Sequence, residues 1–199
     1  MASEDSQSMD YMKRQPHVNA KMREILVSWM AEVTKKWKLV PQTLHIAVSL
    51  VDKYLAREIV TMKRLQLLGV SALFTACKYE EVLHPPVSDF VYVCADAYSS
   101  KDIVDMERLL LNVVAFRLHF RTAYSYLIEH KDLNRIDRQA AVDATNRCIA
   151  RYDLIKHSPQ MLVCGVLHYF GLGSRRSRRE TRELRVEMQS FLGKQSELV

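Results

Sequence analysis

The stretch from Arg64 to Leu83 constrains the fold of this chain more than any other part of the sequence. Between Leu65 and Cys77 it carries no charged residue, and its apolar side chains point to every side of a helix instead of forming one stripe. A helix that is apolar all round is normally buried, with other helices packed around it. A charged turn follows, and the pair Pro85-Pro86 then prevents the helix from continuing. We therefore expect a bundle whose buried central helix presents polar side chains at its end.

Four further helical patterns accompany this stretch in the first part of the chain. Asn19 is a suitable N-cap for a first helix, and Pro41 stands at the start of a second. A shorter helix is expected over residues 87–97, and Ser99 followed by Asp102 predicts the capped start of another. The chain contains only five Gly and five Pro residues, which leaves little material for long loops. The predicted fold class is therefore all-α.

Length and hydropathy limit the classes of protein to which the chain can belong. Its 199 residues suffice for one large domain or two small ones. No apolar run approaches the ~18 residues that a membrane-spanning helix needs, so no membrane partner is expected. Residues 1–10 are polar and acidic, unlike a secretory signal, and we expect them to be a flexible leader.

The cysteines indicate a reducing compartment. Cys77, Cys94, Cys148 and Cys164 are scattered along the chain and form no Cys-x-x-Cys pair. A free cysteine within an apolar helical pattern behaves as a small hydrophobic residue. We therefore expect no disulfide, no metal site and no cofactor, in a protein of the nucleus and cytoplasm.

The sequence contains no motif of a catalytic site. There is no GxSxG, GxxxxGK(S/T), GxGxxG or HExxH motif, and no two histidines stand four residues apart beside a carboxylate. Glu80 and Glu81 are adjacent in the expected helix, so their carboxylates point in directions about 100° apart and do not converge on one substrate. We expect no catalytic residue and no enzymatic activity.

Several segments are similar to the cyclin box, most closely to that of the A- and B-type mitotic cyclins. MREILVSW resembles the family's MRxILVDW, TLHIAVSLVDKYL resembles TLxLAVxxIDRFL, and LQLLGVSALFTACKYEE resembles LQLVGVAALFIAAKYEE. PPVSDFVYV and MERLLLNVVAF are similar to the last two blocks of the box, and YMKRQPHVNAKM is similar to the segment that precedes it. The resemblance implies a cyclin fold, with a complete five-helix N-terminal cyclin box over residues 11–118.

The likeness is weaker over residues 119–172, where the family has a second five-helix repeat. That repeat begins with a Pro-Thr pair in the family, whereas this chain has Arg121-Thr122. Helices are expected over residues 123–130, 138–157 and 158–170, the last of which resembles the family's PSxIAAAALxLA. The apolar pattern is lost after Gly171, so we expect a partial second repeat that is truncated or replaced.

Residues 173–199 are expected to form a divergent, Arg-rich tail. They hold seven Lys or Arg against four Glu, which accounts for half of the net charge of +6. Six arginines lie within residues 174–185, a pattern that fits a nuclear-import or nucleic-acid-binding segment as well as a disordered basic end. No aromatic residue stands among these arginines, so a nucleic-acid partner is not favoured. A chain that stops at Gly173 is expected to keep its function.

The family resemblance assigns roles to charged residues of the box. It implies that Arg23 and Asp52 form an internal ion pair between the first two helices. It also implies that Lys78, Glu107 and Glu80 lie on the face that binds a protein kinase. Without the resemblance, Lys78 and Glu107 would be interpreted as ordinary solvated charges on helices.

The resemblance also implies a shallow docking groove on the first and third helices, which receives RxL-type peptides of substrates and inhibitors. Ser28 stands where the family has Asp, and Ala95 stands near a usual acidic position, so we expect weaker selection for a basic partner. From helical spacing alone, the same apolar residues would belong to the core. The residues expected to form the groove are Met22, Ile25, Leu26, Trp29, Glu32, Leu65 and Gln66.

The function implied by the resemblance is that of a regulatory subunit. Such a subunit forms a heterodimer with a cyclin-dependent serine/threonine protein kinase, activates it allosterically and helps to recruit its substrates, here in cell-cycle control at G2/M. Two alternatives stay open: a kinase-independent adaptor with a cyclin fold, and a transcription-type protein like transcription factor IIB that associates with nucleic acid. No RxxL destruction box precedes the cyclin box in this chain.

Overall fold

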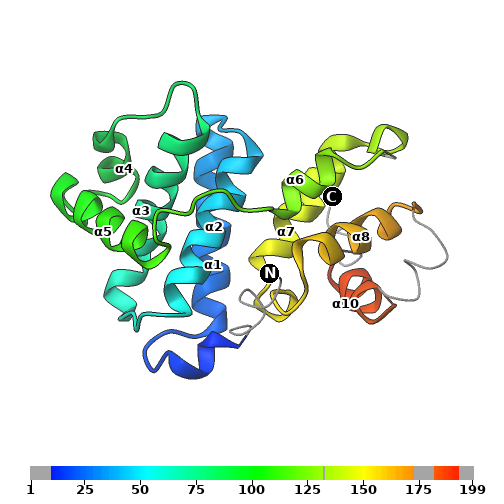
Figure 1. Ribbon diagram of the computed structural model, residues 1–199, viewed down its shortest axis with the longest axis horizontal. Helices are drawn as coiled ribbons and strands as arrows, with labels where there is room; N and C mark the ends of the chain where they lie inside the picture. Colours follow the sequence, from blue (N-terminus) through cyan, green and yellow to red (C-terminus); the bar gives the residue numbers. More distant parts are fainter. Residues whose placement is uncertain (1–9, 132, 173–181, 193–199) are drawn as a thin grey trace. The chain divides into compact units, whose positions relative to one another are not determined.

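The computed structural model describes residues 10–131, 133–172 and 182–192 of the chain, and all regular secondary structure in these ranges is helical. The all-α prediction is confirmed. The chain divides into two compact units, Met1–Phe120 and Arg121–Val199 (Figure 1). Among the described residues, no helix combines the length and the apolar character needed to cross a membrane.

The first unit is built around one buried helix. All residues from Leu67 to Cys77 in this helix are buried, as the sequence predicted. Gly69 allows the first helix to approach closely, because a Cβ atom at Gly69 would lie only 2.6 Å from Cδ1 of Leu26. The helices of this unit are η1 (Tyr11–Arg14, a 3-10 helix), α1 (Ala20–Trp37), α2 (Pro41–Leu55), α3 (Met62–Glu80), α4 (Val87–Val93) and α5 (Ser100–Val113). The buried helix is α3, and α1, α2, α4 and α5 all contact it (Figure 1).

The start signals read from the sequence are confirmed for three helices. The Asn19 side chain accepts a hydrogen bond from the backbone N–H of Met22, and Pro41 is the first residue of α2. Ser99 and Asp102 form a reciprocal capping box at the start of α5. Local side chains therefore determine where α1 and α5 begin.

Helix α4 is shorter than predicted, because it ends at Val93 instead of continuing to residue 97. Ala95 and Asp96 adopt left-handed backbone angles, with φ of 52° and 57°, which a right-handed helix cannot contain. Residues other than glycine adopt this conformation rarely, so this end of α4 could not be predicted from the sequence.

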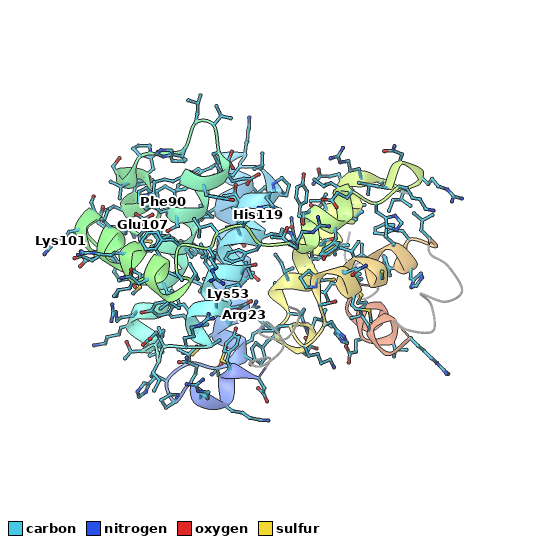
Figure 2. The ribbon with its side chains drawn as sticks, viewed as in Figure 1. Arg23, Lys53, Phe90, Lys101, Glu107 and His119 are labelled. Atoms are coloured by element: carbon cyan, nitrogen blue, oxygen red, sulfur yellow. The ribbon has the colours of Figure 1, made fainter. Side chains whose placement is uncertain are left out.

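An aromatic cluster holds the short α4 against its neighbours. Phe90 is fully buried and packs edge-on against Trp37 of α1 and Phe74 of α3, with ring centroids 4.9 Å and 5.1 Å away (Figure 2). Edge-to-face contacts of this kind add to the stabilisation from apolar burial. A helix of seven residues is thus kept in place by one deeply buried ring.

The second unit has its own core. Its helices are α6 (Ala123–Ile128), η2 (Leu133–Arg135), α7 (Arg138–Ala150), η3 (Tyr152–Leu154), α8 (Pro159–Tyr169) and α10 (Arg182–Leu192). The predicted helix over residues 138–157 is wrong after Ala150. Arg151 has an extended backbone, with ψ of 123°, which ends α7 and precedes the separate turn η3.

Helix α6 begins without the proline that the resemblance led us to look for. Thr122 caps it instead, in a capping box with Ser125. Arg121 makes two hydrogen bonds to the carboxylate of Glu129, and its guanidinium lies 4.4 Å from the centroid of the Tyr126 ring. These local contacts stabilise a helix start at the predicted place.

Residues 182–192 form a helix, α10, that the sequence analysis did not predict. Leu184, Met188 and Leu192 follow one another at four-residue spacing and are almost completely buried in the core of the second unit. A Cβ atom at Gly165 of α8 would lie 2.5 Å from Sδ of Met188, so the two helices touch where glycine leaves room. The expectation that the apolar pattern fails after Gly171 is therefore wrong for this segment. Residues 1–9, 173–181 and 193–199, which include most of the predicted leader and tail, lie outside the described residues.

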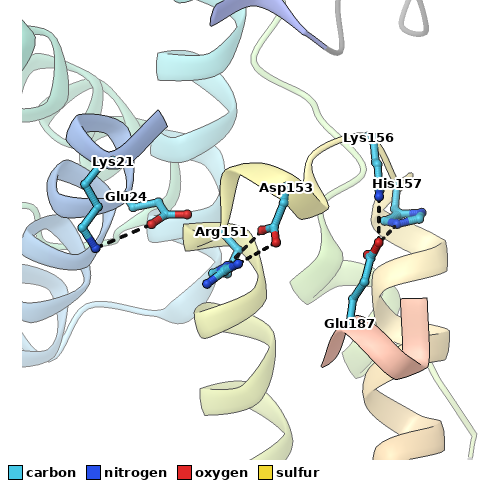
Figure 3. A network of polar contacts seen from close by, with 7 residues as sticks. All are labelled: Lys21, Glu24, Arg151, Asp153, Lys156, His157 and Glu187. Carbon is cyan, nitrogen blue, oxygen red and sulfur yellow. Dashed lines mark hydrogen bonds and ion pairs between the residues drawn. The ribbon is translucent and has the colours of Figure 1, made fainter. Parts of the chain in front are cut away.

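A polar contact also holds α10. Glu187 accepts a hydrogen bond from Nζ of Lys156 at 2.8 Å, and Nε2 of His157 lies 3.4 Å from its other carboxylate oxygen (Figure 3). The hydrogen bond from Lys156 lowers the pKa of Glu187 below its ordinary value, and the charge of Lys156 acts in the same direction. This half-exposed contact supplements the apolar burial of the helix.

The burial of α10 predicts a clear difference between two substitutions in this helix. Met188→Ala removes a fully buried side chain and should cost about 2–5 kcal/mol of unfolding free energy, whereas the exposed Val186→Ala should stay within about 0.5 kcal/mol. Urea unfolding of both variants measures the difference. A chain that ends at Gly173 should be unstable for the same reason, contrary to the expectation from sequence. Equal stability of the two variants would contradict the packing of α10.

The lowered pKa of Glu187 predicts that acid weakens the attachment of α10. A carboxylate with a depressed pKa in the folded state stabilises that state above its unfolded pKa, and the contribution is lost as the pH falls through the folded pKa. Amide hydrogen exchange in α10 should therefore accelerate, relative to the rest of the second unit, as the pH falls below the ordinary Glu value of 4.5. Glu187→Gln should abolish this pH dependence. An unchanged dependence in that variant would show that another group is responsible.

Candidate functional site

Lys78 and Glu107, the two residues expected to bind a partner, are joined to each other. Nζ of Lys78, near the end of α3, lies 2.7 Å from Oε2 of Glu107 on α5, and Thr75 donates a hydrogen bond to Oε1 at 3.1 Å. The Lys78 ammonium also lies 4.4 Å from the centroid of the Phe74 ring. Both residues were expected on one face, but their ion pair was not predicted.

The two members of this pair differ in their access to solvent. The Glu107 side chain is 8% exposed, whereas that of Lys78 is 38% exposed. A buried carboxylate is tolerated only when its oxygens are hydrogen-bonded, and both oxygens of Glu107 have a donor. An ammonium group has three N–H donors, so Lys78 can donate to Glu107 and still donate to an acceptor on another molecule. The arrangement can present a positioned cation at the protein surface.

The two glutamates after Lys78 have different surroundings. Glu80 is exposed, and its pKa is raised by partial burial of the carboxyl group and by the nearby charge of Glu81. Glu81 accepts hydrogen bonds from the backbone N–H of Val40 at 2.9 Å and from Oγ1 of Thr43 at 2.6 Å. It thereby caps the start of α2, which has no side-chain cap of its own. The sequence analysis missed this role because Val40 and Glu81 are 41 residues apart.

Exposed apolar side chains accompany the charged pair, and the sequence analysis did not identify them. Tyr79 follows Lys78 directly, and the next segment carries Val82 and Leu83, which are 98% and 90% exposed. Phe116, just after α5, is 67% exposed and has a left-handed φ of 57°. Large apolar side chains that are exposed in this way are typical of a protein-binding surface. Only the structure distinguishes these residues from core residues of the same types.

The residues expected to form the docking groove lie on α1 and α3, which touch at Leu26 and Gly69. They range from buried to exposed. Leu26 and Leu65 are buried, whereas Ile25 is 59% exposed. Among the others, Met22, Trp29 and Gln66 are half-buried and Glu32 is exposed.

The acidic residues of α1 that lie among these residues in the sequence are Glu24 and Glu32. Ser28 is exposed, as are Glu32 and Asp96. Glu24 lies 3.8 Å from Nζ of Lys21, which reduces its availability to a basic ligand (Figure 3). The exposed Ile25 can contact an apolar ligand group, and the exposed Glu32 can contact a cationic one.

Arg23 and Asp52 are brought together in a buried network. Nε and Nη2 of Arg23 each donate to one carboxylate oxygen of Asp52 at 2.7 Å, and the hydroxyl of the buried Tyr11 donates to Oδ1 at 2.6 Å. Burial alone would lower the pKa of Arg23, but its attraction to Asp52 raises it above the ordinary value. The side chain stays charged and fixed in the interior, so this pair is structural. The participation of Tyr11 was not predicted.

The cysteines have the properties of core residues. Burial raises the pKa of the Cys77 and Cys148 thiols to about 12 and that of Cys94 to about 11, so these thiols are protonated at neutral pH. Within the part of the chain that the structure describes, no group of three or more His, Cys, Asp or Glu side chains could hold a metal ion.

Comparison with known proteins identifies the family of the chain. The family model for the cyclin N-terminal domain matches residues 1–119. G2/mitotic-specific cyclin-B3 of Drosophila melanogaster is 42% identical over 145 residues, which cover 73% of this chain and 24% of that protein. Cyclin-B2-2 of Oryza sativa subsp. indica is 36% identical over 164 residues, which cover 81% of this chain and 39% of the relative. The chain thus spans less than half the length of either relative.

The fold is shared with a solved structure. A viral cyclin from herpesvirus saimiri superposes with a TM-score of 0.72 at 21% identity, over 86% of this chain and 80% of the viral protein. The family model covers more than half of the chain, and the mitotic cyclins match at the level of sequence. The chain belongs to the cyclin family.

Proposed function

We propose that this chain is the regulatory subunit of a cyclin-dependent serine/threonine protein kinase, and that it has no catalytic activity of its own. The observation that carries the proposal is the Lys78–Glu107 pair, which joins the end of α3 to α5 and leaves Lys78 accessible to a partner. The B-type names of the relatives support a role at G2/M. We further propose that the protein acts in the nucleus and cytoplasm, with residues 11–118 as its N-terminal cyclin box and 119–172 as part of a second repeat.

The proposed mechanism is allosteric. Binding of the cyclin surface would hold the regulatory helix of the kinase inward, which completes the Lys–Glu ion pair of the kinase and orders its activation loop. Lys78, held by the Glu107 carboxylate that also accepts a hydrogen bond from Thr75, would donate hydrogen bonds to the kinase, and Glu80 would add an acceptor at the edge. Tyr79 and Phe116 would supply the apolar contact that removes water from these bonds. ATP and magnesium ions belong to the kinase partner.

A second binding surface is proposed for substrates. The half-buried and exposed apolar residues of α1, with Leu65 and Gln66 of α3, would form a groove for RxL-type peptides. The exposure of Ile25 supports this interpretation, because a side chain committed to the core of the unit would be buried. Ser28 in the place of the family's Asp, and the contact of Glu24 with Lys21, favour the apolar part of such a peptide over the basic part.

Substitution of the charged pair tests kinase binding. Lys78→Ala and Glu107→Ala should each weaken kinase affinity by about 2–5 kcal/mol, or roughly 30-fold to several-thousand-fold, because each removes one partner of a charge-assisted bond at a desolvated interface. Both variants should remain folded by circular dichroism. Lys63→Ala changes an exposed lysine at the opposite end of α3 and should leave affinity unchanged. Affinity by calorimetry and phosphorylation of histone by the complex are the measurements.

The same experiment separates the alternatives. If both single variants activate the kinase as the wild type does, the proposed mechanism is wrong. A chain that captures partners without any kinase activity in the complex would be a kinase-independent adaptor. Salt-sensitive binding to DNA would instead indicate the transcription-type alternative.

Substitution of Trp29 tests the docking groove. Trp29 is half-buried, so Trp29→Ala should cost well below the ~3–5 kcal/mol that a core tryptophan contributes, while RxL-peptide binding is lost. Phe90→Ala is the matched control, since this fully buried ring should show the full core cost. The Trp29 variant should activate the kinase toward simple substrates and fail with RxL-bearing ones. A melting temperature lowered as far as that of the Phe90 variant would argue that Trp29 belongs to the core.

A further inference from the structure

The segment that precedes α1 is bound to the first unit by one deeply placed amide. Gln15 is 6% exposed, and its Nε2 donates hydrogen bonds to the backbone carbonyls of Leu55 at 2.6 Å and Glu58 at 2.7 Å. Its Oε1 accepts a hydrogen bond from the backbone N–H of Val60 at 3.1 Å. A neutral side chain with two donors and an acceptor is required for this pattern, and only Gln and Asn provide one.

These three bonds hold the connection between α2 and α3, residues 56–61. Backbone groups in such a connection must be satisfied by secondary structure, side chains or water, and Val60 is buried away from water. Arg14 adds a further bond, from Nη1 to the carbonyl of Ala56 at 3.1 Å. The connection is therefore held in place from outside by the segment that precedes α1.

The connection over residues 56–61 leads directly into α3, and the segment that contains Gln15 leads directly into α1. Asn19 caps α1 four residues after Gln15, and α3 begins at Met62, two residues after Val60. The two helices then meet at Leu26, the seventh residue of α1, and Gly69, the eighth of α3. Gln15 thus joins the segment before α1 to the segment before α3. It does so about two helical turns from the point where the two helices touch.

We propose that Gln15 is a positioning residue for the docking groove, because it fixes the entry of α3 relative to the entry of α1. The inference rests on the proposed docking function of these helices. Loss of the amide would leave the carbonyls of Leu55 and Glu58 and the N–H of Val60 without their partner. The connection would move to reach water, and the spacing of Met22 and Ile25 from Leu65 would change with it.

The test uses the whole 199-residue chain and a fluorescent RxL peptide. Gln15→Ala should weaken peptide binding by about 3-fold to 30-fold, the range typical of substitutions that act through a packed element. Gln15→Glu keeps the shape and the acceptor but loses both donors, so it should weaken binding in the same direction. Arg14→Ala, which removes a single bond from an exposed side chain, should have a smaller effect.

Kinetic constants distinguish a positioning role of Gln15 from a general loss of stability of the first unit. With the kinase bound, the Gln15 variants should raise KM for an RxL-bearing substrate while leaving kcat, and KM for a simple peptide, unchanged. Ser99→Ala, which removes the capping box of α5 in the same unit, is the stability control. It should lower the melting temperature without changing peptide affinity.

The possible outcomes distinguish this inference from the function on which it rests. If the wild-type chain does not bind the peptide, both the docking function and the role of Gln15 are overturned. If the wild type binds and the Gln15 variants bind within twofold of it, or lose no more affinity than Ser99→Ala, only the positioning role is overturned. Should Gln15→Ala fail to fold, the comparison of Gln15→Glu with Arg14→Ala decides the question.

Discussion

The need to cover α3 on every side places the other helices of the first unit. Because its residues from Leu67 to Cys77 are all buried, α1, α2, α4 and α5 have to surround it. Only the two ends of α3 then reach the surface. One end carries Leu65 and Gln66 of the proposed groove, and the other carries Lys78 and Glu80 of the proposed kinase-binding face. Because the middle of α3 is buried, the two proposed binding surfaces lie at its opposite ends and are separated by the length of the helix.

Two ion pairs in this unit, one buried and one partly exposed, have different roles. Arg23 is almost completely buried and uses Nε and Nη2 on Asp52, with Tyr11 completing the network. In the second pair the carboxylate of Glu107 is buried, but Lys78 remains partly exposed. Removal of one member of a buried pair is costly because the other charge is left unpaired. The first pair is therefore committed to the fold, whereas the second can also act on a partner.

Features that depend on neighbouring residues could be predicted from sequence, and features that depend on distant ones could not. The helical class, the caps at Asn19 and Ser99 and the buried α3 follow from local pattern. The pairing of Lys78 with Glu107 joins residues 29 positions apart, so no local pattern reveals it. The apolar spacing of α10 was present in the sequence but was obscured by the arginines around it. The left-handed backbone of Phe116, a bulky residue, had no sequence signal at all.

The cap that Glu81 provides for α2 has a consequence for the order of folding. Helices α1 and α5 receive their caps from Asn19 and Ser99, which are adjacent to them in sequence, so their first turns can gain this stabilisation early. The first turn of α2 depends on a carboxylate 41 residues further along the chain, which arrives only when the end of α3 has docked. Formation of that turn is thus coupled to the closing of a long loop. The start of α2 becomes a late and cooperative step, and its completion reports that the charged end of α3 is in its native place.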